Sequence, residues 1–180
     1  MAYPHLITDA FTHEIIDWTL FESLRAVHTL AVLDMTIAQA GSTDLSTLTH
    51  HSDRGSQYCY NVYITRLNQI HAAISMTEDH KPTDNAIAER VNGILTSKWL
   101  YHTKRPADLR EATCIIAHII DFYNNRRPHM SNNMLTPCKR NSAMTKSLDG
   151  SLCYFSWCQI SFHEGKFSTL HPRRPFPSRM

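Results

Sequence analysis

The chain has 180 residues, which is enough for one domain with a substantial core but too few for two large domains. Apolar residues make up 42% and charged residues 19%, a balance that is typical of a globular protein and excludes a disordered or fibrous chain. The formal charge of +2 permits a polyanionic partner without requiring one.

The cysteines and the hydropathy pattern indicate a soluble protein of the reducing cytoplasm. The cysteines are odd in number and scattered, with no Cys-x-x-Cys pair, which argues against a disulfide framework and a zinc site. They are Cys59, Cys114, Cys138, Cys153 and Cys158. No leader is recognisable, and no apolar run approaches the roughly 20 residues that cross a bilayer. We therefore expect no membrane partner.

The first part of the chain predicts two strands and a helix. Residues 6–11 and 13–18 carry strand-forming side chains on either side of a tight turn. Over 24–40, apolar residues recur at intervals of three and four, as an amphipathic helix requires, and Gly41 follows as a stop signal.

The alternation of strands and helices continues to about residue 123. The expected elements are a strand at 45–50, a helix around 62–70, a strand at 73–77, a loop at 78–83, a helix capped by Asp84, and a helix over 107–123 opened by Pro106. This order predicts an α/β domain with a central sheet covered by helices. Residues 141–180 show no sustained period, and we expect an irregular, poorly ordered tail there.

Two acidic residues stand out in segments that suit metal chemistry. Asp53 follows a predicted strand and precedes a turn at Gly55, whereas Glu89 lies in the second turn of a predicted helix. Carboxylates are the ligands that Mg²⁺ prefers, and two such ions about 4 Å apart catalyse phosphodiester chemistry. Taken alone the pair is weak evidence, because an Asp before a glycine is usually a turn residue.

Four segments in a fixed order strengthen the metal interpretation. They are 7–16 (ITDAFTHEII), 50–58 (HHSDRGSQY), 84–89 (DNAIAE) and 122–129 (FYNNRRPH) followed by 135–137 (LTP). Together they resemble the integrase core of insertion-sequence transposases, the DDE group that includes the retroviral integrases. The resemblance covers roughly residues 3–140, and four ordered motifs are far more specific than one.

The resemblance implies a ribonuclease-H-like fold with a mixed sheet and flanking helices, dependence on Mg²⁺ or Mn²⁺, and DNA cleavage and strand transfer. Carried over by position, Asp53 is the second acidic residue and Glu89 the third, both as catalytic residues and as metal ligands. The family's first acidic residue lies on the first strand, and the match to this chain starts on the second. Asp9 therefore aligns with a non-catalytic position. We expect a partial core over 1–140 that lacks the first strand, binds metal weakly and is inactive.

Several further residues have candidate roles. Those expected to contact nucleic-acid phosphates are Arg54, Arg90, Arg126 and Arg127. Those expected to support the site are Gly55 and Asn85. A solvated or packed position is the simpler interpretation for Lys98, Trp99, Tyr101, Lys104 and Arg105. The two histidines before Asp53, His50 and His51, are interpreted as structural and not as metal ligands.

Two classes of function remain open from the sequence. The first is a transposase core that acts on the ends of a mobile DNA element, with another copy of itself or an intact transposase as its protein partner. The second is a non-catalytic remnant that binds nucleic acid or associates with an intact transposase. An unrelated ribonuclease-H-like nuclease is a third possibility, which the Asn-Arg-Arg-Pro-His segment disfavours.

Overall fold

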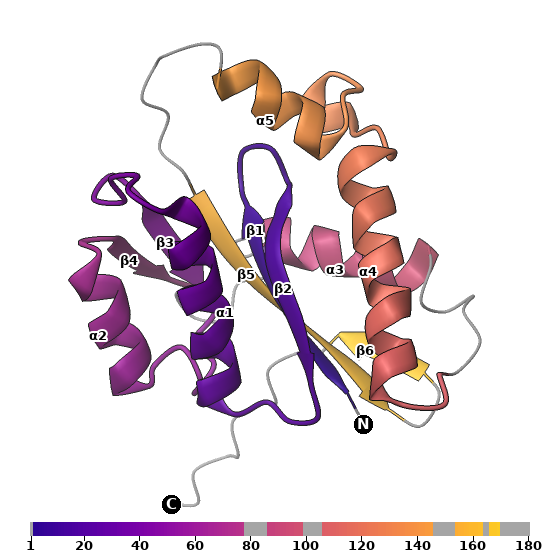
Figure 1. Ribbon diagram of the computed structural model, residues 1–180, viewed down its shortest axis with the longest axis horizontal. Helices are drawn as coiled ribbons and strands as arrows, with labels where there is room; N and C mark the ends of the chain where they lie inside the picture. The colour runs from indigo at the N-terminus through magenta and orange to yellow at the C-terminus, as the bar shows by residue number, and fades with distance from the viewer. Residues whose placement is uncertain (1, 78–85, 99–105, 146–153, 164–165, 170–180) are drawn as a thin grey trace, which may run out of the picture.

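A computed structural model describes residues 2–77, 86–98, 106–145, 154–163 and 166–169 (Figure 1). The elements are β1 (Tyr3–Asp9), β2 (Ile15–Phe21), α1 (Ala26–Ala40), β3 (Thr49–Ser52), α2 (Asn61–Gln69), β4 (Ala73–Met76), α3 (Ala86–Lys98), α4 (Leu109–Asn125), η3 (Met130–Asn132), α5 (Pro137–Thr145), β5 (Tyr154–His163) and β6 (Lys166–Thr169). The predicted alternation of strands and helices is confirmed, with boundaries shifted by a few residues. In the described part of the chain, no helix is long and apolar enough to cross a membrane.

The sheet is mixed, and its strand order is β2-β1-β5-β3-β4, with β6 paired to β5. β1 runs antiparallel to β2 and to β5, whereas β3 runs parallel to β4 and to β5. β5 therefore lies between β1 and β3 and is hydrogen-bonded to both. The parallel pair β3 and β4 is joined by α2, as a crossover connection requires.

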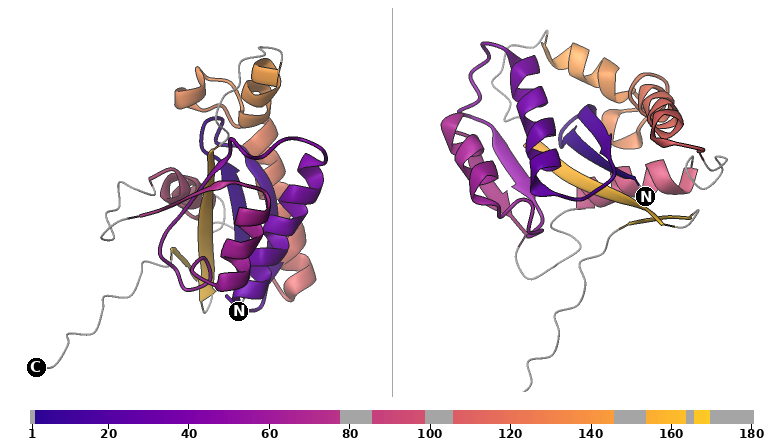
Figure 2. Two further views of the ribbon diagram at one scale, coloured as in Figure 1. Left: turned by 90° about the vertical axis from the view of Figure 1, so that its left-hand side faces the viewer. Right: turned by 60° about the horizontal axis from the view of Figure 1, so that its bottom comes forward.

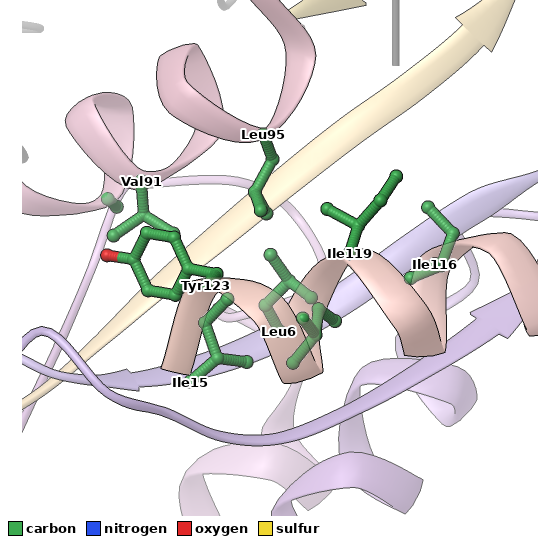
Figure 3. Packing of buried hydrophobic residues seen from close by; sticks show 9 residues of the cluster. Leu6, Ile15, Val91, Leu95, Ile116, Ile119 and Tyr123 are labelled. Carbon is green, nitrogen blue, oxygen red and sulfur yellow. The ribbon is translucent and has the colours of Figure 1, made fainter. Parts of the chain in front are cut away.

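Both faces of the sheet are covered, because successive side chains of β1 point to opposite sides. Leu6 packs with buried residues of α3 and α4, whereas Ile7 packs with buried residues of α1 and α2. Figure 2 shows α1 and α3 on opposite faces of the sheet. Figure 3 shows the cluster around Leu6, where Val91 and Leu95 of α3 meet Ile119 and Tyr123 of α4. Residues 5–8 are accordingly buried on both faces.

α4 packs against the edge strand β2 and contributes the broad apolar stripe predicted from its sequence. The buried members of the stripe are Ile116, Ile119, Ile120 and Tyr123. The helix begins after Asp108, whose carboxylate accepts a hydrogen bond from the backbone N–H of Glu111 at 2.7 Å. This cap satisfies one of the free donors at the start of a helix.

The expectation of an irregular tail from residue 141 differs from the structure. α5 continues to Thr145, and the chain then forms β5, which pairs with β1 and β3, and β6. The partners of β5 are distant in sequence, since Leu6 stands opposite Cys158 and His50 opposite Phe155. Local periodicity does not reveal a strand whose hydrogen-bonding partners lie so far away in the chain.

Candidate metal and nucleic-acid site

Asp53 follows the last residue of β3 and is partly exposed, as the sequence predicts. Its carboxylate Oδ1 accepts a hydrogen bond from the backbone N–H of Gly55 at 2.9 Å. The turn then anchors in the core, because the N–H of Tyr58 donates to the carbonyl of Gly55 at 2.9 Å and Tyr58 is buried. The carboxylate is held at the end of the strand and keeps further lone pairs for another ligand.

The limit on side-chain size at position 55 is steric, whereas the backbone conformation there does not itself call for glycine. A Cβ atom added there would lie 2.9 Å from Oδ1 of Asp53 and against the side-chain amide of Gln57. Any larger residue must therefore displace the Asp53 carboxylate or the Gln57 amide. This contact gives a physical basis for the supporting role proposed for Gly55.

The two histidines that precede Asp53 differ in environment. His50 is buried, and its Nε2 lies 3.1 Å from the hydroxyl of Tyr63 on α2. Burial, followed by the charge of His51, lowers the pKa of His50 to about 4, so its ring is neutral near pH 7. His51 is half-buried and its Nδ1 lies 2.9 Å from the Ser75 hydroxyl of β4. The structural interpretation of His50 is confirmed.

Glu89 lies in the first turn of α3 and is exposed. α3 packs against β5, and β3, which leads directly to Asp53, is paired with β5. The two carboxylates are thus carried by elements that flank the same strand. Asn85 and Asp84 lie outside the described residues.

The described residues contain no group of three His, Cys, Asp or Glu side chains arranged to hold a metal ion. β5, the strand between β1 and β3, has no Asp or Glu anywhere in its sequence YFSWCQISFH. Asp9 lies at the end of β1, but its carboxylate accepts hydrogen bonds from the N–H and the hydroxyl of Thr12 in the following turn. The carboxylates predicted as ligands are Asp53, directly after β3, and Glu89 on α3, and both elements contact β5. One hard divalent ion completed by substrate oxygens suits such a set.

The four arginines predicted to contact phosphates lie on three different segments. Arg54 is exposed on the β3–α2 connection, and Arg126 is exposed at the C-cap of α4. Arg90 is exposed beside Glu89 on α3, and Arg127 is half-buried after α4.

Sequence reasoning missed two histidines that join these arginines. His13, in the β1–β2 turn, is stacked on His129, with ring centroids 6.1 Å apart. Nη1 of Arg127 lies 3.1 Å from Nε2 of His129. Arg90 lies near enough for its charge to lower the pKa values of both histidines, although burial is the larger cause in each. The Arg-Pro-His sequence at 127–129 was a signal that could have identified this contact.

Two family models, both described as an integrase core domain, match the chain. One covers residues 1–82 and the other residues 71–137. The matches overlap and together span all four segments that carry the resemblance. They end before β5, so the segment that lies between β1 and β3 is outside the family match.

Curated relatives are insertion-sequence proteins. The putative transposase of IS986/IS6110 from Mycobacterium tuberculosis is 29% identical over 70% of this chain and 46% of its own length. The IS629 transposase of Shigella sonnei is 31% identical over 70% of this chain and 41% of its own length. The chain spans about half the length of such relatives.

Solved structures with a similar fold are retroviral integrase catalytic cores. The BIV integrase core has a TM-score of 0.52 at 17% identity, covering 72% of this chain and 80% of the other. The HTLV-2 core, solved with magnesium, has a TM-score of 0.53 at 16% identity, covering 76% of this chain and 82% of the other. The ribonuclease-H-like fold is thereby confirmed. This chain belongs to the integrase core family, and its curated relatives are insertion-sequence transposases.

Proposed function

We propose that this chain is the core of an insertion-sequence transposase that acts on DNA in the cytoplasm. Asp53 and Glu89 are the metal ligands and catalytic residues of that core. The observation that supports the proposal is that Asp53 directly follows β3, which is paired with β5, whereas Glu89 lies on α3, which packs against β5. The relatives add support, because they are transposases and the similar HTLV-2 core was solved with magnesium.

Asp53 and Glu89 would hold one Mg²⁺ or Mn²⁺ ion, completed by phosphate oxygens of DNA. Such an ion stabilises charge on a phosphodiester and lowers the pKa of a bound water. The chain's own contribution is to orient the Asp53 carboxylate through the Gly55 N–H. Arg54 and Arg90, each next to a ligand in sequence, would supply positive charge for the phosphates. Asn85 would support the start of α3.

We propose in addition that the 180-residue chain is inactive in strand transfer. The described residues hold no group of three potential metal ligands, and β5 carries no Asp or Glu. Chemistry with two metal ions needs at least one further carboxylate to bridge them. The second candidate function follows from the same observation. A chain that keeps the arginines but has fewer than three acidic ligands would still bind DNA, or associate with an intact transposase or another copy of itself. Either kind of binding would interfere with transposition.

The decisive experiment measures Mn²⁺ binding and strand transfer on the same preparation. Electron paramagnetic resonance should show weak binding of Mn²⁺ to the wild-type chain, and binding should be lost in Asp53→Asn and Glu89→Gln. Glu22→Gln, an exposed carboxylate before α1, is the matched control and should bind as the wild type does. Robust strand transfer by the wild-type chain would overturn the proposed inactivity, and Mn²⁺ binding that survives both substitutions would overturn the site.

A further inference from the structure

The β1–β2 turn and the segment after α4 meet at two stacked imidazole rings, and Val91 of α3 belongs to the same buried cluster as Tyr123, which contacts one of them. His13 comes from the turn and His129 from the segment after α4, and their rings are 18° from parallel. The ring of His129 is also held edge-on by Tyr123, with centroids 4.8 Å apart. The hydroxyl of Ser131 lies 3.2 Å from Nδ1 of His13. The rings are therefore fixed by contacts from both sides.

The tautomer of His129 follows from its partner. Arginine has only donors, so the 3.1 Å contact requires Nη1–H of Arg127 to donate to an unprotonated Nε2. Burial, with the nearby charges of Arg127, His13 and Arg90, lowers the pKa of His129 to about 4. The ring is then a neutral acceptor at pH 7. Pro128 separates the two residues and stops the helix, which lets the imidazole turn back onto the guanidinium.

The charges in this region are not balanced by carboxylates. In the described part of the chain, ion pairing is confined to Arg66 and Asp34 on α2 and α1, so neither Arg90 nor Arg127 is paired. Asp9 lies close enough for its charge to raise the pKa of His13, although burial lowers that pKa by more. Its carboxylate is already bound by backbone and hydroxyl donors of its own turn. The guanidinium groups near these rings thus have no salt-bridged carboxylate among the described residues, an arrangement that attracts a further anion.

We propose that the guanidinium groups of Arg90 and Arg127 form a site for a phosphate of the DNA backbone. His129 is the positioning residue that holds Arg127 in this site through its Nε2. His13 stacks on the ring of His129 and keeps it in place. Arg90 follows the candidate ligand Glu89 directly, so a phosphate bound here continues the DNA path next to the acidic site. This inference rests on the proposed DNA function. It adds the two histidines and explains why Arg127, and not the exposed Arg126, is held in place.

The test measures affinity for a duplex of unrelated sequence by fluorescence anisotropy at several salt concentrations. Arg127→Ala and Arg90→Ala should each weaken binding about tenfold at low salt, and each should reduce the salt slope by about one unit. Arg110→Ala is the matched control. Arg110 lies in the first turn of α4, about 22 Å from the end that leads to Arg127. It should leave both the affinity and the slope unchanged.

The role of His129 is tested by replacing its acceptor. His129→Phe should weaken binding as much as Arg127→Ala does, and the double variant should be no weaker than either single variant. His129→Gln, which restores an acceptor, should recover most of the affinity. Circular dichroism verifies folding, and if His129→Phe does not fold, the His129→Gln and Arg90→Ala variants decide. Additive losses in the double variant, or no rescue by glutamine, would overturn the positioning role.

The outcomes also separate this site from the proposed function. If the wild-type chain does not bind duplex DNA at low salt, both the proposed DNA function and the phosphate site are refuted. If the wild-type chain binds but Arg90→Ala and Arg127→Ala keep the wild-type salt slope, only the phosphate site is refuted.

Discussion

The side-chain amide of Asn124 pairs with both backbone groups of Ile15. Its Oδ1 accepts the Ile15 N–H at 3.0 Å, and its Nδ2 donates to the Ile15 carbonyl at 2.8 Å. β2 is the edge strand of the sheet, so the N–H and C=O of Ile15 have no further strand to pair with on that side. The Asn124 amide supplies both hydrogen-bonding partners in place of a strand. The contact ties the last turn of α4 to the hairpin that carries His13.

Replacing Asn124 should reduce stability. Asn124→Leu leaves a half-buried N–H and C=O without partners, which should lower the free energy of unfolding by roughly 1–3 kcal/mol. Urea denaturation followed by circular dichroism measures the change. Asn125→Leu is the control, because the Asn125 amide bonds only the exposed Asp121 side chain one turn away. An equal loss in both variants would show that the amide pairing of Ile15 contributes nothing specific.

Removal of the segment after α5 should destroy the fold. Deleting 146–180 takes away β5, which is hydrogen-bonded to β1 on one side and β3 on the other. The buried polar groups of both strands would lose their partners, and cooperative thermal unfolding should disappear. Deleting only 170–180, which lie beyond β6, should keep the transition. A folded, cooperative 1–145 chain would contradict the placement of β5.

Gly55 and Gly93 form a matched pair of glycine-to-alanine substitutions. Gly55→Ala should weaken Mn²⁺ binding and lower stability by no more than about 1 kcal/mol, since the new methyl group meets the ends of the Asp53 and Gln57 side chains, which can shift. Gly93→Ala, inside α3 with nothing near the added methyl group, should raise stability by about 0.5–1 kcal/mol. Calorimetry and metal titration test both. Unchanged Mn²⁺ binding in Gly55→Ala would mean that the Asp53 carboxylate can move freely.

Stability should fall as the solution is acidified from about pH 6.5 towards pH 4. Burial lowers the pKa of His5, His50 and His129 to about 4 in each case. In the unfolded chain the histidines have ordinary pKa values near 6.5, so over this pH interval the unfolded chain binds more protons than the native chain. The free energy of unfolding therefore decreases as the pH falls. Each histidine can contribute roughly 3 kcal/mol.

The histidine contribution is measured by urea unfolding at pH 7, 6, 5 and 4.5. His50→Gln should flatten the pH dependence, because one of the three neutral imidazoles is removed. The exposed His118 on α4 supplies the control, and His118→Gln should leave the slope as it is. A wild-type stability that is flat between pH 7 and 4.5 would show that these rings are protonated in the folded protein.

Hydrophobic periodicity was sufficient to predict most of the elements and their order. α1 and α4 repeat apolar residues every three or four positions because each buries one face against the sheet. The Asp53 turn was also predictable, since a strand followed by Asp and Gly favours an exposed carboxylate. His50 and Tyr63 show the limit of this reasoning. A strand-end histidine suggests a structural role, but only the fold identifies the hydroxyl that it contacts.

The sequence by itself determined the family, the α/β order and the two carboxylates, because these depend on local motifs and side-chain chemistry. The tertiary structure decided that β5 lies between β1 and β3 and that α3 packs against β5. It also decided that His13 stacks on His129, which contacts Arg127, and that the charge of Arg90 acts on both histidines. These relationships join segments that are far apart in the chain, such as Leu6 with Cys158 and His13 with His129. Hydrogen bonds between strands and contacts between side chains depend on which distant segments the fold brings together. A local sequence pattern carries no information about those partners.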